Sequence, residues 1–166
     1  KAKVRSAYNF YKDPYNDYGK AKEAIDEAVV NEQSKGMAEA WYYRGLIYSA
    51  LYTSESFKSL CNQCLETAVE SFQKANELDP KNQWIDEINT FRIPQVKQLI
   101  FSSGVSSFNS GNFTKALSDF EYVLKLSPGD TTVTLNSAIS AENAGNKEKA
   151  KFYYKQLTSM NYNDDH

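Results

Sequence analysis

The fold is decided by Trp41-x-x-Arg44-Gly45-x-x-Tyr48, by Ala68-x-x-x-Phe72-x-x-Ala75, and by the Asp79-Pro80 step that follows them. Residues three and four apart lie on one face of a helix, so each motif predicts a helix with a small or apolar face. Gly45 lacks a side chain and lets a second helix approach closely, whereas Pro80 lacks an amide donor and ends a helix. We therefore expect two packed helices, at about 36–52 and 60–78.

Small residues recur along the chain at a fixed interval. The interval is 34 residues for three pairs, which are Gly111 and Gly145, Ala116 and Ala150, and Gly104 and Ala138. We expect Gly45, Gly104 and Ala138 to face the second helix of their own helix pair. Four alanines anchor the second helices: Ala21, Ala68, Ala116 and Ala150. The residues four and seven places later form a predicted core stripe: Ile25, Phe72, Phe120, Tyr154, Ala28, Ala75, Val123 and Leu157.

The same reasoning predicts the remaining helices at about 2–12, 18–32, 94–110, 112–126, 130–144 and 146–159. Between these elements, Trp84, Ile85, Ile88 and Phe91 stand at helical spacing. They predict an extra short helix that packs onto the array, and the Ile93-Pro94 step is expected to break it from the next helix.

These motifs and the 34-residue interval resemble the tetratricopeptide repeat family. The resemblance implies an all-α fold, an α-solenoid (right-handed superhelix) of about four helix-turn-helix units within one domain, 1–166. The expected repeats are 1–34, 38–81, 97–130 and 131–164, with an insertion at 49–60 and a linker helix at 82–93. Arg44 and Ser107 depart from the family pattern, which has Leu and an aromatic residue at these two positions.

In this family, the first helices of the repeats form a concave wall that holds another polypeptide. Carried over position by position, the expected partner-binding groove contains Tyr8, Tyr11, Tyr42, Tyr43, Leu46, Phe101, Val105, Phe108 and Asn136. Tyr and Phe offer large contact area at small entropic cost, so we take Tyr8, Tyr42, Phe101 and Phe108 as anchors for a peptide. About half of the groove residues are expected to fill core space instead, and at least one of the adjacent Tyr42 and Tyr43 is expected to pack inward.

Composition and motifs argue against several other functions. A net charge of -2 provides no positive field for nucleic acid, and the most apolar stretch, 46–52, is too short to insert in a membrane. His166 is the single histidine, and no Gly-rich phosphate loop is present. The sequence predicts a protein that is not an enzyme, needs no cofactor and holds no metal. The Lys, Asn and Arg residues of a carboxylate clamp are also missing from the expected groove.

Cys61-x-x-Cys64 is the one arrangement that suggests a reaction. The two thiols could form a redox pair or half of a zinc site, but the strand-helix-strand setting of redox pairs and two further zinc ligands are missing. Small buried side chains in the insertion are the simpler interpretation. Whether the cysteines are free or paired stays open.

The leading hypothesis is a non-enzymatic module that binds a protein or peptide in the aromatic groove. The alternative is an assembly subunit that docks or self-associates through its C-terminal end, at Tyr153, Tyr154, Met160 and Tyr162. A thiol role of the cysteine pair comes third. The start without Met suggests a trimmed chain, and a general resemblance to envelope-associated bacterial repeat proteins favours the periplasm or cell envelope, with the cytoplasm kept open.

Overall fold

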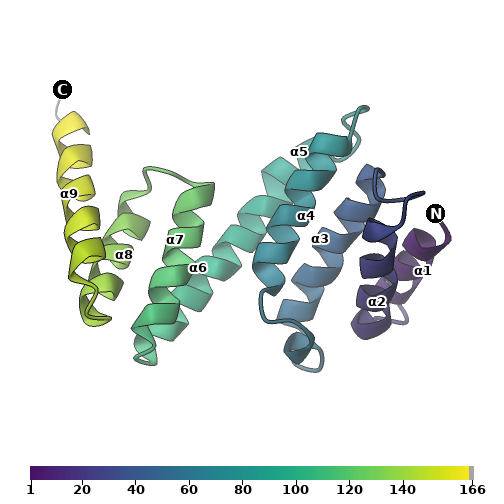
Figure 1. The fold of residues 1–166 in the computed structure, drawn as a ribbon, viewed down its shortest axis with the longest axis horizontal. Helices are drawn as coiled ribbons and strands as arrows, with labels where there is room; N and C mark the ends of the chain where they lie inside the picture. The colour runs from purple at the N-terminus through teal and green to yellow at the C-terminus, as the bar shows by residue number, and fades with distance from the viewer. Residues whose placement is uncertain (165–166) are drawn as a thin grey trace. The chain divides into compact units, whose positions relative to one another are not determined.

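The computed structural model describes the backbone of residues 1–164 and the side chains of residues 1–160. The chain divides into two compact units, Lys1–Val96 and Lys97–His166, and the division falls inside helix α6. The first unit contains α1 (Ala2–Tyr11), α2 (Tyr18–Val30), α3 (Ala38–Thr53), η1 (Lys58–Leu60), α4 (Cys64–Leu78), α5 (Ile85–Glu87) and η2 (Ile88–Arg92). Then follow α6 (Ile93–Asn109), α7 (Phe113–Leu126), α8 (Thr131–Asn143) and α9 (Lys147–Asp164). The expected all-α class is confirmed for the described residues, and successive helices pair as hairpins within each unit (Figure 1).

The helix ends repeat at the interval seen in the sequence. Asn112 and Asn146 each donate their backbone N–H to a carbonyl of the preceding helix, at Ser107 and Ala141, both at 2.8 Å. Their side chains then accept from the backbone N–H three residues later, which caps the next helix. Each asparagine follows a glycine with positive φ, the backbone conformation that ends many helices. One Gly-Asn pair thus ends one helix and starts the next.

Small residues set how closely the paired helices approach. A Cβ built on Gly45 of α3 would lie 2.4 Å from the ring of Phe72 on α4, and one built on Gly104 of α6 would lie 2.8 Å from Phe120 on α7. Both rings are fully buried. The prediction that these two glycines face the second helix of their pair is confirmed, and Ala138 is likewise buried in a cluster with residues of α7 and α9.

The prediction of a buried core stripe is confirmed in three of the four helix pairs. Ile25, Phe72 and Phe120 are buried, but Tyr154 is 38% exposed, and its neighbour Tyr153 is the buried residue, at 9%. The prediction was wrong at Tyr154. Ala138 stands where α3 and α6 have Gly45 and Gly104, and it lies in one buried cluster with Tyr153.

The extra helix also differs from expectation. The helical backbone continues from Ile85 through Pro94 without a break, because residues Ile88–Arg92 form a π-helical turn. In this wider turn the N–H of Ile93 donates to the carbonyl of Ile88. A π turn relieves the clash that a proline ring makes with the carbonyl four residues earlier, so Pro94 is tolerated inside a helix. The limits of the repeats and the single domain stay predictions.

Candidate partner-binding surface

The exposed Tyr8 of α1 meets the partly buried Tyr43 of α3. The rings of Tyr8 and Tyr43 stack with centroids 4.8 Å apart and an interplanar angle of 24°. Tyr8 is 37% exposed, and the Lys12 ammonium lies 5.1 Å from its ring centroid. The pair forms a rigid aromatic surface that solvent reaches.

A cleft of about 500 Å³ adjoins this pair. Its lining consists of Lys1, Val4, Arg5, Tyr8, Met37, Glu39 and Tyr43. The apolar part comes from the two tyrosines, Val4 and Met37, while Arg5 and Glu39 add opposite charges. Burial and the neighbouring Glu39 carboxylate raise the pKa of Tyr43 to about 12, so its hydroxyl remains a hydrogen-bond donor at neutral pH.

Tyr42 points away from this cleft, as expected for one member of an adjacent pair. It is 6% exposed, stacks on Trp84 with centroids 5.4 Å apart, and donates its hydroxyl to Glu87 at 2.8 Å. Arg92 donates to the same carboxylate, also at 2.8 Å. Burial and the bond to Glu87 raise the pKa of Tyr42 to about 12. The segment 84–92 therefore covers this part of α3.

The other predicted groove residues have mixed surroundings. Leu46 is buried, and Tyr11 is partly buried with its ring 6.0 Å from that of Tyr18. In the second unit, Phe101 packs on Phe120 of α7, with centroids 5.5 Å apart. Phe108 packs on Phe113, Val105 is exposed, and Asn136 is partly buried. Within the first unit, the structure brings Tyr8 and Tyr43 together at an open cleft, whereas Tyr42 and Leu46 lie in the core.

The two cysteines form a disulfide. Cys61 and Cys64 are bonded, with their Cα atoms 5.5 Å apart, in the segment between α3 and α4. Among the described residues, no three His, Cys, Asp or Glu side chains gather closely enough to hold a metal ion.

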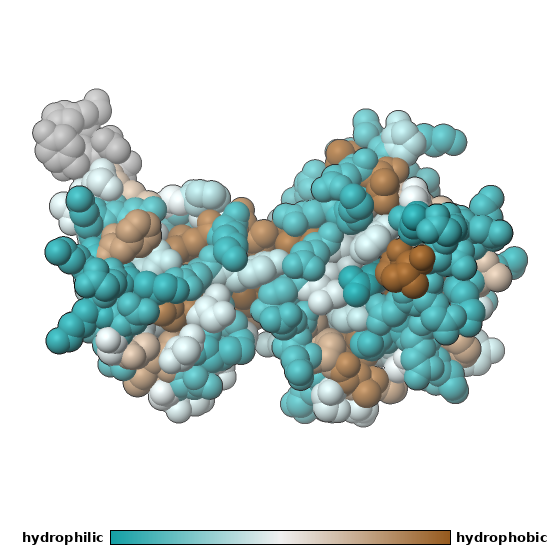
Figure 2. All heavy atoms as spheres, viewed as in Figure 1, coloured by the Kyte–Doolittle hydropathy of each residue, from teal (hydrophilic) through white to brown (hydrophobic). Residues whose placement is uncertain are grey.

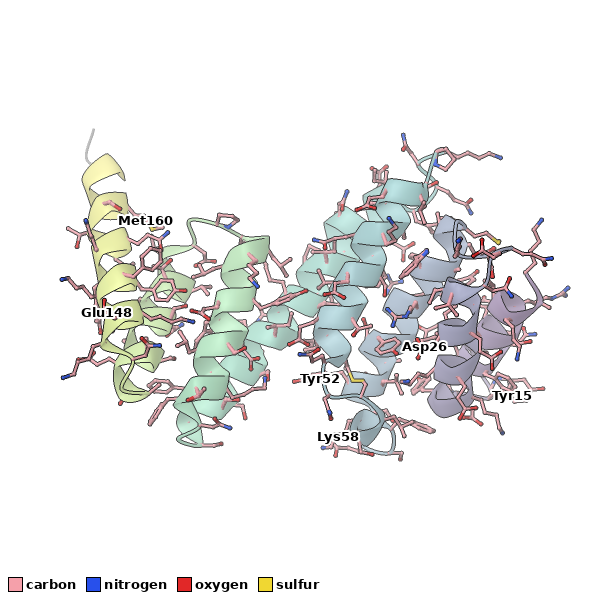
Figure 3. The ribbon with its side chains drawn as sticks, in the orientation of Figure 1. Tyr15, Asp26, Tyr52, Lys58, Glu148 and Met160 are labelled. Atoms are coloured by element: carbon pink, nitrogen blue, oxygen red, sulfur yellow. A yellow bond between two sulfur atoms is a disulfide. The ribbon has the colours of Figure 1, made fainter. Side chains whose placement is uncertain are left out.

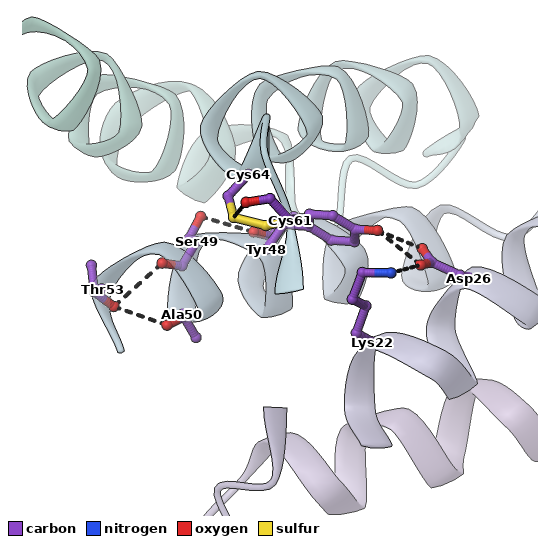
Figure 4. Close-up of a disulfide and its surroundings, with 9 residues drawn as sticks. Lys22, Asp26, Tyr48, Ser49, Ala50, Thr53, Cys61 and Cys64 are labelled. Carbon is purple, nitrogen blue, oxygen red and sulfur yellow. Dashed lines mark hydrogen bonds and ion pairs between the residues drawn. A yellow bond between two sulfur atoms is a disulfide. The ribbon is translucent and has the colours of Figure 1, made fainter. Parts of the chain in front are cut away.

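Sequence reasoning missed a polar cluster between α2, α3 and α4. Asp26 on α2 accepts from the Tyr48 hydroxyl at 2.8 Å and from Arg44 Nε at 3.0 Å, and it forms an ion pair with Lys22 at 2.9 Å (Figures 3 and 4). Arg44 also donates to Ser71 on α4. Burial alone would raise the pKa of Asp26, but the bonds from Lys22, Tyr48 and Arg44 outweigh it and hold that pKa below its ordinary value. Arg44, which departs from the family pattern, was the available signal, because a partly buried guanidinium requires a carboxylate partner.

The C-terminal helix presents a second surface. Phe152 is 59% exposed and lines a cleft of about 510 Å³ between α7 and α9, together with Leu124, Lys125 and Tyr153. The Tyr153 hydroxyl donates to Glu121 at 2.8 Å. Met160 is partly exposed, and the side chain of Tyr162 lies outside the described residues. The face in Figure 2 shows apolar side chains in separate patches rather than one continuous surface.

Residues 135–164, which span most of α8 and α9, match the family model of the tetratricopeptide repeat. This match covers less than half of the chain, so the likeness to the family holds for one helix pair. Such repeats stack on their neighbours and build extended binding surfaces. Within residues 1–164, no helix combines the length and hydropathy needed to cross a membrane.

Two solved structures are similar to this chain at low identity. One, described as the crystal structure of MamA, is 16% identical, with 98% of this chain and 78% of that chain covered and a TM-score of 0.39. The other, the crystal structure of MamA protein, is also 16% identical, with 95% and 70% covered and a TM-score of 0.37. No curated protein matches the sequence.

Proposed function

We propose that this protein binds an extended segment of another polypeptide, without catalysis, and that an apolar side chain of the partner enters the cleft beside Tyr8 and Tyr43. The observation that supports this best is the stacked, solvent-accessible tyrosine pair at a cleft of about 500 Å³. Tyrosines in such positions are frequent binding hot spots, since they bury large area with few rotatable bonds.

Preorganisation is the proposed mechanism of affinity. Tyr8 belongs to α1 and Tyr43 to α3, and both helices are fixed by packing against α2, while α3 also packs against α4. The rings are therefore in place before a ligand arrives, which limits the entropy lost on binding. Tyr42 has a supporting role in this scheme, because it holds α3 to Trp84 and Glu87.

Selection of peptides from a random library on the intact protein tests the proposal and does not require the natural partner. Selected peptides are measured by calorimetry against the wild type, Tyr8→Ala, Tyr43→Ala and the control Tyr15→Ala, which removes a tyrosine that is 69% exposed. We expect each of the first two changes to weaken binding by about thirtyfold, the effect of a 2 kcal/mol hot spot, and the control to have no effect. Unchanged affinity in folded Tyr8→Ala and Tyr43→Ala variants would show that the site lies elsewhere.

A second candidate is self-association through α9, favoured by the exposed Phe152 beside the cleft between α7 and α9. Light scattering over a concentration series tests it. Self-association requires a mass that grows with concentration and a loss of that growth in Phe152→Ser, whereas a constant monomer mass rules it out.

A further inference from the structure

The segment between α3 and α4, residues 54–63, is fastened to the start of α4 by the Cys61–Cys64 disulfide (Figure 4). The segment also packs against α3 through η1 and reaches α2 through two side chains. Phe57 meets Tyr18 of α2 edge to face, with centroids 5.6 Å apart. Phe57 and Leu60 both lie 3.5 Å from the position that a Cβ on Gly19 would take. The backbone bonds within the segment are local turns, such as those from Phe57 and Lys58 to Ser54.

The two sulfur atoms have different surroundings. Cys61 is partly exposed and has extended backbone outside the helix, whereas Cys64 is 4% exposed and is the first residue of α4. An incoming nucleophile therefore reaches Cys61 more easily than Cys64. When Cys61 is attacked, the sulfur of the buried Cys64 is the leaving group.

The start of α4 suits a thiolate at Cys64. The N-cap residue of α4, Gln63, makes no side-chain cap bond, in contrast to Asp17, Asn112 and Asp130 at the starts of α2, α7 and α8. The first N–H groups of a helix have no partner within it, and together with the helix dipole they stabilise a negative charge. A thiolate that these N–H groups stabilise is a good leaving group in thiol–disulfide exchange.

We propose that Cys61 and Cys64 form a thiol–disulfide exchange site whose substrate is a dithiol reductant, and that reduction releases the segment 54–63 from α2. A thiolate of the reductant attacks Sγ of Cys61, the bond between the two cysteines breaks, and Cys64 leaves as a thiolate. The second thiol of the reductant then displaces Cys61 from the mixed disulfide. The reductant loses two electrons and two protons, and the cysteines gain both, so the exchange is balanced. This activity is separate from peptide binding.

The helix pair itself does not depend on the disulfide. The bridge spans a sequence separation of 3, and so short a loop restricts the unfolded chain little. The α3–α4 pair is held instead by the contact between Gly45 and the buried Phe72. Reduction therefore changes the mobility of the segment rather than the stability of the fold.

The experiment treats the native chain with dithiothreitol, blocks free thiols with N-ethylmaleimide, and measures hydrogen exchange of the same sample by mass spectrometry. We expect both cysteines to be labelled in the absence of denaturant, and exchange at residues 54–63 to rise about tenfold, while the amides of α3 and α4 stay protected. A parallel sample with glutathione, a monothiol, traps the first step. Its mixed disulfide should be found at Cys61.

The double variant Cys61→Ser, Cys64→Ser is the matched control. In this variant, residues 54–63 should exchange as fast as in the reduced wild type before any reductant is added. Adding the reductant should not change that rate. A disulfide that reacts only after denaturation would overturn the exchange site. Unchanged exchange at 54–63 after reduction would overturn the release, and a mixed disulfide at Cys64 would overturn the order of attack.

Discussion

The helix pairs α3–α4 and α8–α9 follow one sequence pattern but pack differently at one position. In α3–α4, Gly45 leaves room for the ring of Phe72, which is fully buried. In α8–α9, Ala138 takes the place of the glycine, and Tyr154, the counterpart of Phe72, is 38% exposed. The comparison teaches that a shared sequence pattern does not by itself fix which aromatic residue of a helix pair lies in the core.

The largest expected effect is the loss of the buried ring. Phe72→Ala should lower the free energy of unfolding by about 3–5 kcal/mol, since it leaves a cavity between closely packed helices. Both tryptophans of the chain, Trp41 and Trp84, lie in the first unit, so their fluorescence during urea unfolding reports on this unit alone. An effect as small as that of Tyr154→Ala would mean that the two aromatic positions are equivalent.

Adding a Cβ at Gly45, where α3 contacts α4, should have the next largest effect on the free energy of unfolding. Gly45→Ala places a methyl group within 2.4 Å of the Phe72 ring, which has no free space into which to move. We expect a loss of about 2–3 kcal/mol in the same fluorescence measurement, despite the better helix propensity of alanine. Gly36→Ala is the control, since a Cβ there meets nothing within 4 Å, and it should leave the free energy of unfolding nearly unchanged.

The polar cluster of the first unit should make stability depend on pH. The pKa of Asp26 is lowered in the folded state, so its contribution is fully present above the unfolded pKa of about 4 and is lost as pH falls through the lower, folded value. Asp26→Asn should therefore lower the free energy of unfolding by about 1–2 kcal/mol at neutral pH. This difference from the wild type should shrink in urea titrations below about pH 4, and a constant difference would contradict the assigned protonation state.

The smallest expected effects on the free energy of unfolding concern Tyr153 and Tyr154 of α9, which should differ from each other. Tyr153→Phe removes the hydroxyl that donates to Glu121 from a buried ring and should cost about 1 kcal/mol. Tyr154→Phe removes an exposed bond to Glu142 and should cost less than about 0.5 kcal/mol. Circular dichroism during urea unfolding measures both. Equal costs would indicate that Tyr154 is as firmly packed as Tyr153.

The fold was predictable from the sequence because single residues determine where helices end and how closely they can approach. Gly45 and Gly104 allow a close helix approach because they lack a side chain, and Pro80 ends a helix because it lacks an amide donor, so both features can be read from the residue type. The site was less predictable, because the environment of a side chain depends on segments far away in sequence. Tyr42 is covered by Trp84 and Glu87, and Asp26 meets Arg44 and Tyr48, and none of these contacts follows from a helical period.

The close contact between α3 and α4 does not depend on the segment that connects them, and this has a practical consequence. The pairs α6–α7 and α8–α9 are joined by a tight Gly-Asn turn, whereas α3 and α4 are joined by the long segment 54–63, and Gly45 packs against Phe72 all the same. A connection that plays no part in aligning its helices can be exchanged as a module. Residues 54–63 are thus a natural grafting position, where a protein engineer can install a foreign epitope or sensor loop and keep the helical framework unaltered.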